Sequence, residues 1–146
     1  MASRIAKLPL AASIVALAGL VDAIYLTIHH YNAEPVPCGA GFDCETVLTS
    51  AYADFNGIPL AAFGAAAYFA AFSLALLAAF GDRRMWKLFG VLATIMAVFS
   101  CWLIFLQAFR IGAFCQYCLV SAGTSITLFV LFLVSWILSR RGTEGT

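Results

Sequence analysis

Five cysteines are the residues best suited to do chemistry in this chain of 146 residues. Cys115 and Cys118 form a CQYC motif, whereas Cys38 and Cys44 have five residues between them in the stretch PVPCGAGFDC. Cysteines with CxxC spacing can close a small disulfide ring, and a helix N-terminus favours the thiolate through its unpaired amide groups. A stabilised thiolate leaves readily in disulfide exchange. The CQYC motif therefore indicates either a redox pair or a static disulfide that ties a loop to a helix.

The second pair, Cys38 and Cys44, lies in a stretch with two glycines and two prolines, which disfavour a helix and leave the backbone permissive. Such a loop could carry a disulfide between two neighbours, and two pairs together can pass electrons by thiol–disulfide exchange. The presence of both pairs favours a redox relay over two static disulfides. Cys101 lies in an apolar stretch, where a lone cysteine is expected to behave as a small hydrophobic side chain.

Metal binding is the other common use of four cysteines. Zinc sites favour two short C-x2–4-C knuckles, and only the CQYC pair has that spacing. His29 and His30 are near in the sequence but form no evident ligand pattern with the C-x5-C pair. We therefore expect no metal site, and a cysteine-based membrane metal carrier stays the alternative function.

The elements that position these cysteines are apolar. The chain is 64% hydrophobic and 10% charged, which excludes an ordinary soluble domain and a disordered chain. Its net charge of +1 gives no basic surface for nucleic acid. Four stretches approach or exceed the roughly 20 apolar residues that cross a bilayer, over 8–28, 58–80, 88–109 and 118–138. The sequence predicts one all-α integral-membrane domain over 1–146, with four transmembrane helices.

The basic residues predict the orientation. If the four spans alternate, seven of the eight lysines and arginines lie on one side, and Arg110 alone lies on the other. The positive-inside rule then makes both termini cytoplasmic. The outer segments 34–57 and 110–117 and the start of the fourth span place both cysteine pairs in an oxidising extracytoplasmic compartment. Residues 1–18 also resemble a secretory signal, but the apolar run continues past the small-x-small site at 16–18, which favours a membrane span.

Polar side chains inside the spans suggest a pocket. Asp22, Tyr25 and His29 share one helical face, and Cys118, Ser121 and Ser125 share another by the same spacing. Ionisable residues in a membrane usually face the interior of the bundle. These two stripes predict a small polar pocket near the outer leaflet, with ordinary interhelical hydrogen bonding as the alternative.

The segment 45–56, ETVLTSAYADFN, alternates apolar and polar residues with helical spacing. This pattern is typical of a short amphipathic helix that lies horizontally in the membrane interface. Because it follows Cys44 directly, it is expected to cover the extracytoplasmic end of the bundle beside the loop cysteines.

Disulfide formation needs an electron acceptor. The sequence has no GxGxxG motif for flavin or nicotinamide and no CxxCH motif for haem. A lipid-soluble quinone, which reaches a membrane bundle from the bilayer, fits by elimination.

The motifs GLVDAIYLTIHHY, C-x5-C, CETVLTSAY, NGIPLAAFG and FCQYCLVSA, in this order, resemble the vitamin K epoxide reductase family in its compact bacterial form. The resemblance covers nearly the whole chain. It implies a four-helix bundle around a quinone, with a short horizontal helix over its outer end. The DsbB family does a similar task, but its CxxC comes in the first outer segment, so the order here favours the vitamin K epoxide reductase relatives.

The resemblance also implies roles for individual residues. Cys118 matches the cysteine next to the quinone, and Cys115 matches its partner, which exchanges with the loop. Cys38 and Cys44 match the loop shuttle pair. Ser50 matches a serine that the family places near the site.

With Ser50 and Cys118, the pocket residues Ser121 and Asp22 are the expected quinone contacts. The quinone is expected to be ubiquinone, menaquinone or a vitamin K type.

The implied partner is a thioredoxin-like protein of the periplasm or lumen, which attacks the loop disulfide. Because only a short tail follows the fourth span, it is expected to act in trans, at a bacterial plasma membrane. Cys44 is weakly favoured as the cysteine that meets it. A structural membrane subunit with static disulfides is the further alternative.

Overall fold

Four long helices make up most of the computed structural model, which describes the backbone of residues 2–32, 37–48 and 54–144. They are α1 (Ala2–Asn32), α3 (Leu60–Ala79), α4 (Arg83–Leu106) and α5 (Gln116–Glu144). Each contains a stretch long and apolar enough to cross a membrane. The predicted fold class, an all-α bundle with four candidate membrane spans, is confirmed, and the chain is a multi-pass membrane protein.

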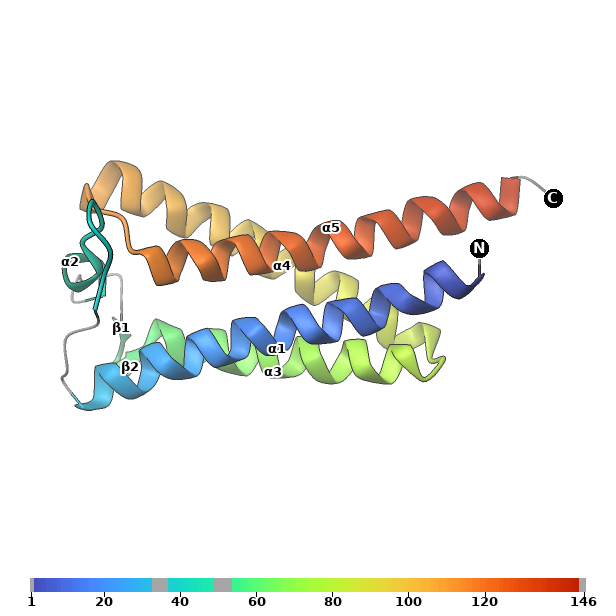
Figure 1. Ribbon diagram of the computed structural model, residues 1–146, viewed down its shortest axis with the longest axis horizontal. Helices are drawn as coiled ribbons and strands as arrows, with labels where there is room; N and C mark the ends of the chain where they lie inside the picture. The colour runs from blue at the N-terminus through green and yellow to red at the C-terminus, as the bar shows by residue number, and fades with distance from the viewer. Residues whose placement is uncertain (1, 33–36, 49–53, 145–146) are drawn as a thin grey trace.

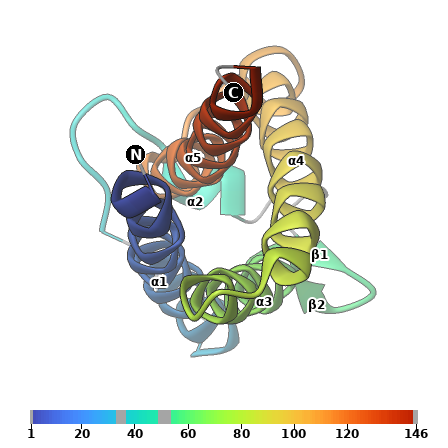
Figure 2. The same cartoon turned by 90° about the vertical axis from the view of Figure 1, so that its right-hand side faces the viewer.

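The four helices form a ring. Both α1 and α4 pack against α3 and α5, so the order around the bundle is α1–α3–α4–α5 (Figure 2). The beginning of α1, the end of α5 and the turn between α3 and α4 lie at one end (Figure 1). The short elements that follow α1 lie at the other end, together with the start of α5. The alternation of the spans, on which the predicted grouping of basic residues depends, is therefore present.

Small side chains let α1 and α3 approach closely. Ala12 and Ala16 on α1 and Ala71 and Ala75 on α3 are fully buried. Membrane helices associate through such small residues because lipid supplies no hydrophobic drive to pack large ones. Gly19 is needed at this interface, since a Cβ atom there would overlap the ring of Tyr68.

The short elements between α1 and α3 correct one prediction. The helix α2 covers only Cys44–Leu48, and residues 49–53 are outside the described part of the chain. The amphipathic helix predicted over 45–56 is wrong at its C-terminal end, because β1 (Asp54–Phe55) pairs antiparallel with β2 (Ile58–Pro59). The physical reason is the Asn56-Gly57 turn, with φ of 53° and 84°, since this dipeptide favours a two-residue hairpin.

The region before α5 also departs from the predicted spans. The helix α4 continues into a π-helix, η1 (Gln107–Ile111), which ends at Gly112 with a left-handed φ of 74°. Single π-turns of this kind are frequent at functional sites. The helix α5 then begins at Gln116, two residues before the predicted start, so that Cys115 directly precedes its first residue.

Candidate functional site: two cysteine pairs at one end of the bundle

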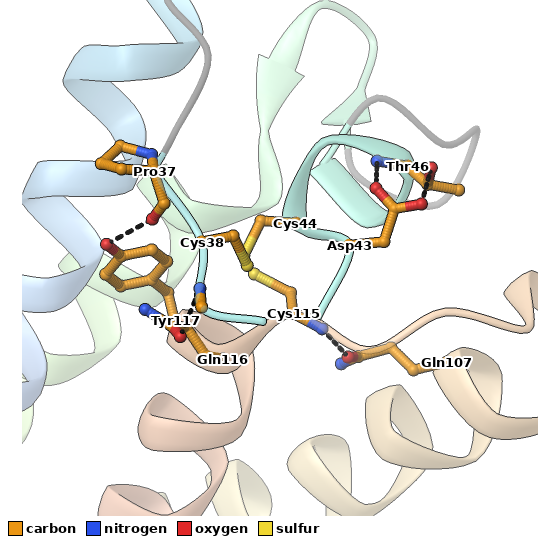
Figure 3. The surroundings of a disulfide bond; sticks show 10 residues. Pro37, Cys38, Asp43, Cys44, Thr46, Gln107, Cys115, Gln116 and Tyr117 are labelled. Atoms are coloured by element: carbon orange, nitrogen blue, oxygen red, sulfur yellow. Dashed lines mark hydrogen bonds between the residues drawn. A yellow bond between two sulfur atoms is a disulfide. The ribbon is translucent and has the colours of Figure 1, made fainter. Parts of the chain in front are cut away.

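The two cysteine pairs, which the sequence separates by more than 70 residues, lie side by side in the structure. Cys38 and Cys44 form a disulfide, whereas Cys115 and Cys118 are free thiols. Figure 3 shows the Cys115 side chain directed at this disulfide. All four cysteines that were predicted to do chemistry therefore belong to one site.

Burial distinguishes the two cysteines of the loop. Cys44 is 1% exposed and forms a small buried cluster with Val47 and the fully buried Cys115, whereas Cys38 is partly exposed. Cys38 and Cys118 pack against the edge of this cluster. Cys44 thus faces the second pair, and the weak expectation that Cys44 meets an external partner is not supported by its burial.

Cys44 is placed by the start of α2. The carboxylate of Asp43 accepts hydrogen bonds from the backbone N–H of Thr46, at 3.2 Å, and from its Oγ1, at 2.6 Å (Figure 3). This is the arrangement of a helix N-cap. The same two hydrogen bonds lower the pKa of Asp43. Capping therefore fixes the backbone at Cys44, the first residue of the helix.

Cys115 lies one position earlier relative to its own helix, directly before Gln116, the first residue of α5. Its backbone C=O accepts a hydrogen bond from the N–H of Leu119, at 3.0 Å. Its backbone N–H donates to Oε1 of Gln107, also at 3.0 Å, and this glutamine is 3% exposed. The π-turn η1 carries Gln107, so the irregular end of α4 holds the cysteine at the start of the next helix. Sequence reasoning missed Gln107, although an amide in an otherwise apolar span is a usable signal.

The helix start also activates the Cys115 thiol. A hydrogen bond from the Cys118 thiol, aided by the backbone N–H groups of Cys118 and Tyr117, lowers the pKa of Cys115 to about 7. Burial and the carboxylate of Asp22 oppose this shift but do not outweigh it. The thiolate preference predicted for a cysteine at a helix N-terminus is present at Cys115.

A network of hydroxyl groups lies one helical turn beyond Cys118. The hydroxyl of Tyr68 donates to the backbone C=O of Ser121, at 2.5 Å, and lies 2.9 Å from Ser121 Oγ and 2.8 Å from Ser125 Oγ. Tyr68 is 1% exposed and reaches this network from α3. The predicted stripe on α5 therefore faces the interior. Its partner Tyr68 is a residue that the sequence analysis missed, because a tyrosine in a span without charged residues has no spacing that marks it.

The predicted stripe on α1 faces the same region. The ring of Tyr25 lies 4.3 Å from that of His29 and 5.4 Å from that of Tyr117, measured between centroids. Asp22 is half-buried, and its Oδ2 atom is buried with no hydrogen-bond partner within the described residues. An unpaired carboxylate oxygen inside the bundle, close enough to act on the Cys115 thiol, is a candidate contact for a ligand or a proton.

Three remaining expectations concern residues away from this cluster. Ser50 lies outside the described residues. Cys101 is free and exposed on the surface of α4, as suits a lipid-facing position. Over the residues 2–32, 37–48 and 54–144, no group of three or more histidine, cysteine, aspartate or glutamate side chains could hold a metal ion.

Comparison with known sequences agrees with this site. Residues 10–133 match the vitamin K epoxide reductase family over a stretch that contains all four cysteines. The chain belongs to this family. Among curated relatives of the family, the thiol-disulfide oxidoreductase LTO1 of Arabidopsis thaliana is 33% identical over 124 residues, which is 77% of this chain and 32% of the relative. The chain thus spans about a third of the length of that relative, and the family resemblance drawn from the motifs is confirmed.

Proposed function

We propose that this protein is a disulfide-forming membrane oxidoreductase that passes electrons from a thioredoxin-like partner through Cys38 and Cys44 to Cys115 and Cys118, and then to a quinone. The observation that carries the proposal is the packing of the Cys38–Cys44 disulfide against the buried Cys115. Exchange requires direct contact between sulfur atoms, and this packing brings the two pairs together. Family membership and the name of the Arabidopsis relative add support.

Exposure favours Cys38 as the site of the first step. A thiolate of the reduced partner attacks Sγ of Cys38, the Cys38–Cys44 bond breaks, and Cys44 leaves as a thiolate. The second thiol of the partner then displaces Cys38, which leaves the loop as a dithiol and the partner as a disulfide. Two electrons have moved from the partner to the loop. The burial of Cys44 supports this order, because Cys38 is the partly exposed residue of the pair.

The second step passes the same two electrons inward. The Cys44 thiolate attacks Sγ of Cys115 in the Cys115–Cys118 disulfide, and Cys118 leaves as a thiolate. Cys38 then displaces Cys115 and closes the loop disulfide again. The lowered pKa of Cys115 makes it a good leaving group in this displacement. The products, a closed loop and two free thiols, are the arrangement that the structure shows.

A quinone fits the polar groups of the adjoining interior. Asp22 lies on α1, and Cys118 and Ser121 lie on α5, which packs against α1. The unpaired Oδ2 of Asp22 supplies a polar contact that no described residue satisfies. These residues would hold the quinone, and Ser50 is proposed as a further contact. When bound, the quinone supplies the two-electron oxidant that restores the Cys115–Cys118 disulfide.

The same topology supports a location. With the spans alternating, the basic residues gather at the end opposite the cysteines, and the positive-inside rule makes that end cytoplasmic. The cysteines then face the periplasm of a bacterial plasma membrane, where disulfides persist. A periplasmic thioredoxin-like protein is the proposed partner.

The decisive test is quinone-dependent oxidation by the purified protein in detergent. A reduced thioredoxin-like protein should be oxidised with one quinone consumed per disulfide formed, and Cys118→Ala should stop quinone reduction. Cys101→Ala, which alters the one cysteine outside the site, serves as the matched control and should retain wild-type turnover. Full activity in Cys118→Ala, or metal bound stoichiometrically to the reduced protein, would contradict the proposal.

A further inference from the structure

Two side chains between the active-site cysteines bind the loop that carries the other pair. The Tyr117 hydroxyl donates a hydrogen bond of 2.7 Å to the backbone C=O of Pro37. The amide oxygen of Gln116 accepts one of 3.0 Å from the backbone N–H of Gly39 (Figure 3). Pro37 and Gly39 are the residues on either side of Cys38. The Q and Y of the CQYC motif thus flank the exposed end of the loop disulfide.

A third hydrogen bond secures the other end of the loop. The backbone N–H of Asp43, the residue before Cys44, donates to the C=O of Phe114, at 2.8 Å. Phe114 is the residue before Cys115. The neighbours of one cysteine pair are therefore hydrogen-bonded to the neighbours of the other pair at three points.

Both side chains are held in place for this contact. The Tyr117 ring packs against Tyr25, which itself packs against His29, so α1 supports it from the side. At the other contact, a Cβ atom added to Gly39 would lie 2.9 Å from the amide oxygen of Gln116, which is too close for an ordinary contact. Glycine at position 39 is what allows the Gln116 side chain to lie against the loop backbone.

The loop needs such contacts because it has little regular structure of its own. Residues 37–43 form a coil with one turn, and the preceding described element, α1, ends at Asn32. Without contacts to α5, Cys44 would depend on α2 alone for its position. We infer that Gln116 and Tyr117 are positioning residues that form a loop clamp, which holds Cys44 against Cys115 and so sets the efficiency of exchange between the two pairs.

This inference rests on the proposed relay but can be tested without a quinone or a partner. In a protein carrying Cys38→Ala, Cys101→Ala and Cys118→Ala, only Cys44 and Cys115 remain. The variant is equilibrated in glutathione redox buffers, quenched with acid and alkylated, and the fraction with a Cys44–Cys115 disulfide is measured. This fraction gives the effective concentration of the Cys44 thiol relative to Cys115. The loop clamp predicts that Tyr117→Phe and Gln116→Ala each lower this concentration about fivefold, the scale of one net hydrogen bond.

Tyr31→Phe is the matched control. It removes the same hydroxyl from an exposed tyrosine on α1 whose described ring contact is His30, and it should leave the effective concentration unchanged. Tyr117→Phe keeps the ring that packs on Tyr25, so the variant is expected to fold. Equal effective concentrations in wild type, Tyr117→Phe and Gln116→Ala would overturn the loop clamp.

A second measurement needs no clamp variant. Amide hydrogen exchange on the wild-type protein in detergent should show protection at Gly39, whose N–H group donates to Gln116 of the loop clamp. Exchange of Gly39 at the rate of an unstructured peptide would overturn the inference. Neither measurement depends on turnover. If the loop clamp is wrong, the protein still oxidises its partner with a quinone. If the relay is wrong, this activity is absent, but the effective concentration and the amide exchange can still be measured.

Discussion

The two cysteine pairs reach their common site in different ways. Cys115 and Cys118 lie at the start of a long helix, and a buried glutamine from the preceding π-turn holds the backbone of Cys115. Cys38 and Cys44 lie at the two ends of a coil, and only Cys44 has a capped helix after it. One pair is positioned by the bundle, and the other takes its position largely from contacts with the first.

This difference suits the chemistry proposed for each pair. The pair that would face a quinone has to keep a fixed geometry and a stabilised thiolate, which a helix N-terminus supplies. The pair that would meet a protein partner has to expose one sulfur while keeping the other next to Cys115. A loop held by hydrogen bonds can do both, because such bonds are individually weak and can be broken and remade.

The largest expected effect comes from removing the fixed pair. Cys115→Ala should lower thiol oxidation at least about 10³-fold, the scale expected when a covalently reacting residue is lost. The rate of quinone-dependent oxidation of a thioredoxin-like protein measures this, with Cys101→Ala as control. Retention of more than a tenth of the activity would mean that the loop pair can bypass Cys115.

The two loop cysteines should differ strongly in the amount of mixed disulfide that each forms with the partner. The partner in this test carries a single cysteine, activated as its disulfide with thionitrobenzoate. In Cys44→Ala, the thiolate of the partly exposed Cys38 should displace thionitrobenzoate and accumulate as a mixed disulfide with the partner, because neither the loop nor the partner has a second thiol to displace it. In Cys38→Ala, the buried Cys44 should yield at least about tenfold less of this adduct, since Cys115 competes for it at high effective concentration. Non-reducing gels and mass spectrometry quantify the adducts, and equal trapping by both variants would contradict the roles assigned from burial.

The free energy of unfolding should distinguish the hydrogen bond that holds Cys115 from the one that holds the loop. Gln107→Met preserves side-chain length but leaves the N–H of Cys115 without its buried acceptor, which should cost about 1–3 kcal/mol of unfolding free energy. Gln116→Met removes a half-exposed acceptor from the loop contact and should cost less, about 0.5–1 kcal/mol. Reversible unfolding in mixed micelles compares the two. A larger cost for Gln116→Met would reverse the distinction between a pair fixed by the bundle and a pair held by contacts.

The smallest effect concerns pH. In a protein that retains only Cys115 and Cys118, thiolate absorbance should rise with a midpoint near pH 7, because hydrogen bonding lowers the pKa of Cys115 to about 7. Below that pH the thiol is protonated, so exchange through Cys115 should slow as the pH falls. Removing the hydrogen-bonding thiol in Cys118→Ala should move the midpoint up toward about 8.5, the value of an ordinary cysteine. An unchanged midpoint would show that Cys118 does not stabilise the thiolate.

Much of the fold followed from local hydropathy. The four apolar stretches and their alternation were predicted because a membrane span needs only length and composition. The helix predicted over 45–56 was wrong at residues 54–56, because the prediction followed the apolar spacing and not the Asn56-Gly57 turn signal. In the structure, β1 and β2 pair across the Asn56-Gly57 turn, and this hairpin replaces the predicted helix there.

The site was predicted less completely than the fold. The four cysteines are conspicuous by type and spacing, and Asp22 is conspicuous as an acid in a span. Gln107 was missed although an amide in an apolar span is a usable signal. Gln116, Tyr117 and Tyr68 were missed because no spacing along the chain indicates what their side chains contact. Ser50 stays a prediction, as do Ser121 and Asp22 as quinone contacts.

Composition and spacing along the chain specify which segments cross the membrane, which end of the bundle carries the cysteines, and which residues could exchange disulfides. These properties depend on composition and on spacing along one helix or loop. The tertiary structure alone decided that Cys44, and not Cys38, is buried against Cys115, and that Tyr117 and Gln116 hydrogen-bond residues 80 and 77 positions away. Hydrogen bonds and burial over such separations arise only when helices pack, so no local pattern can specify them.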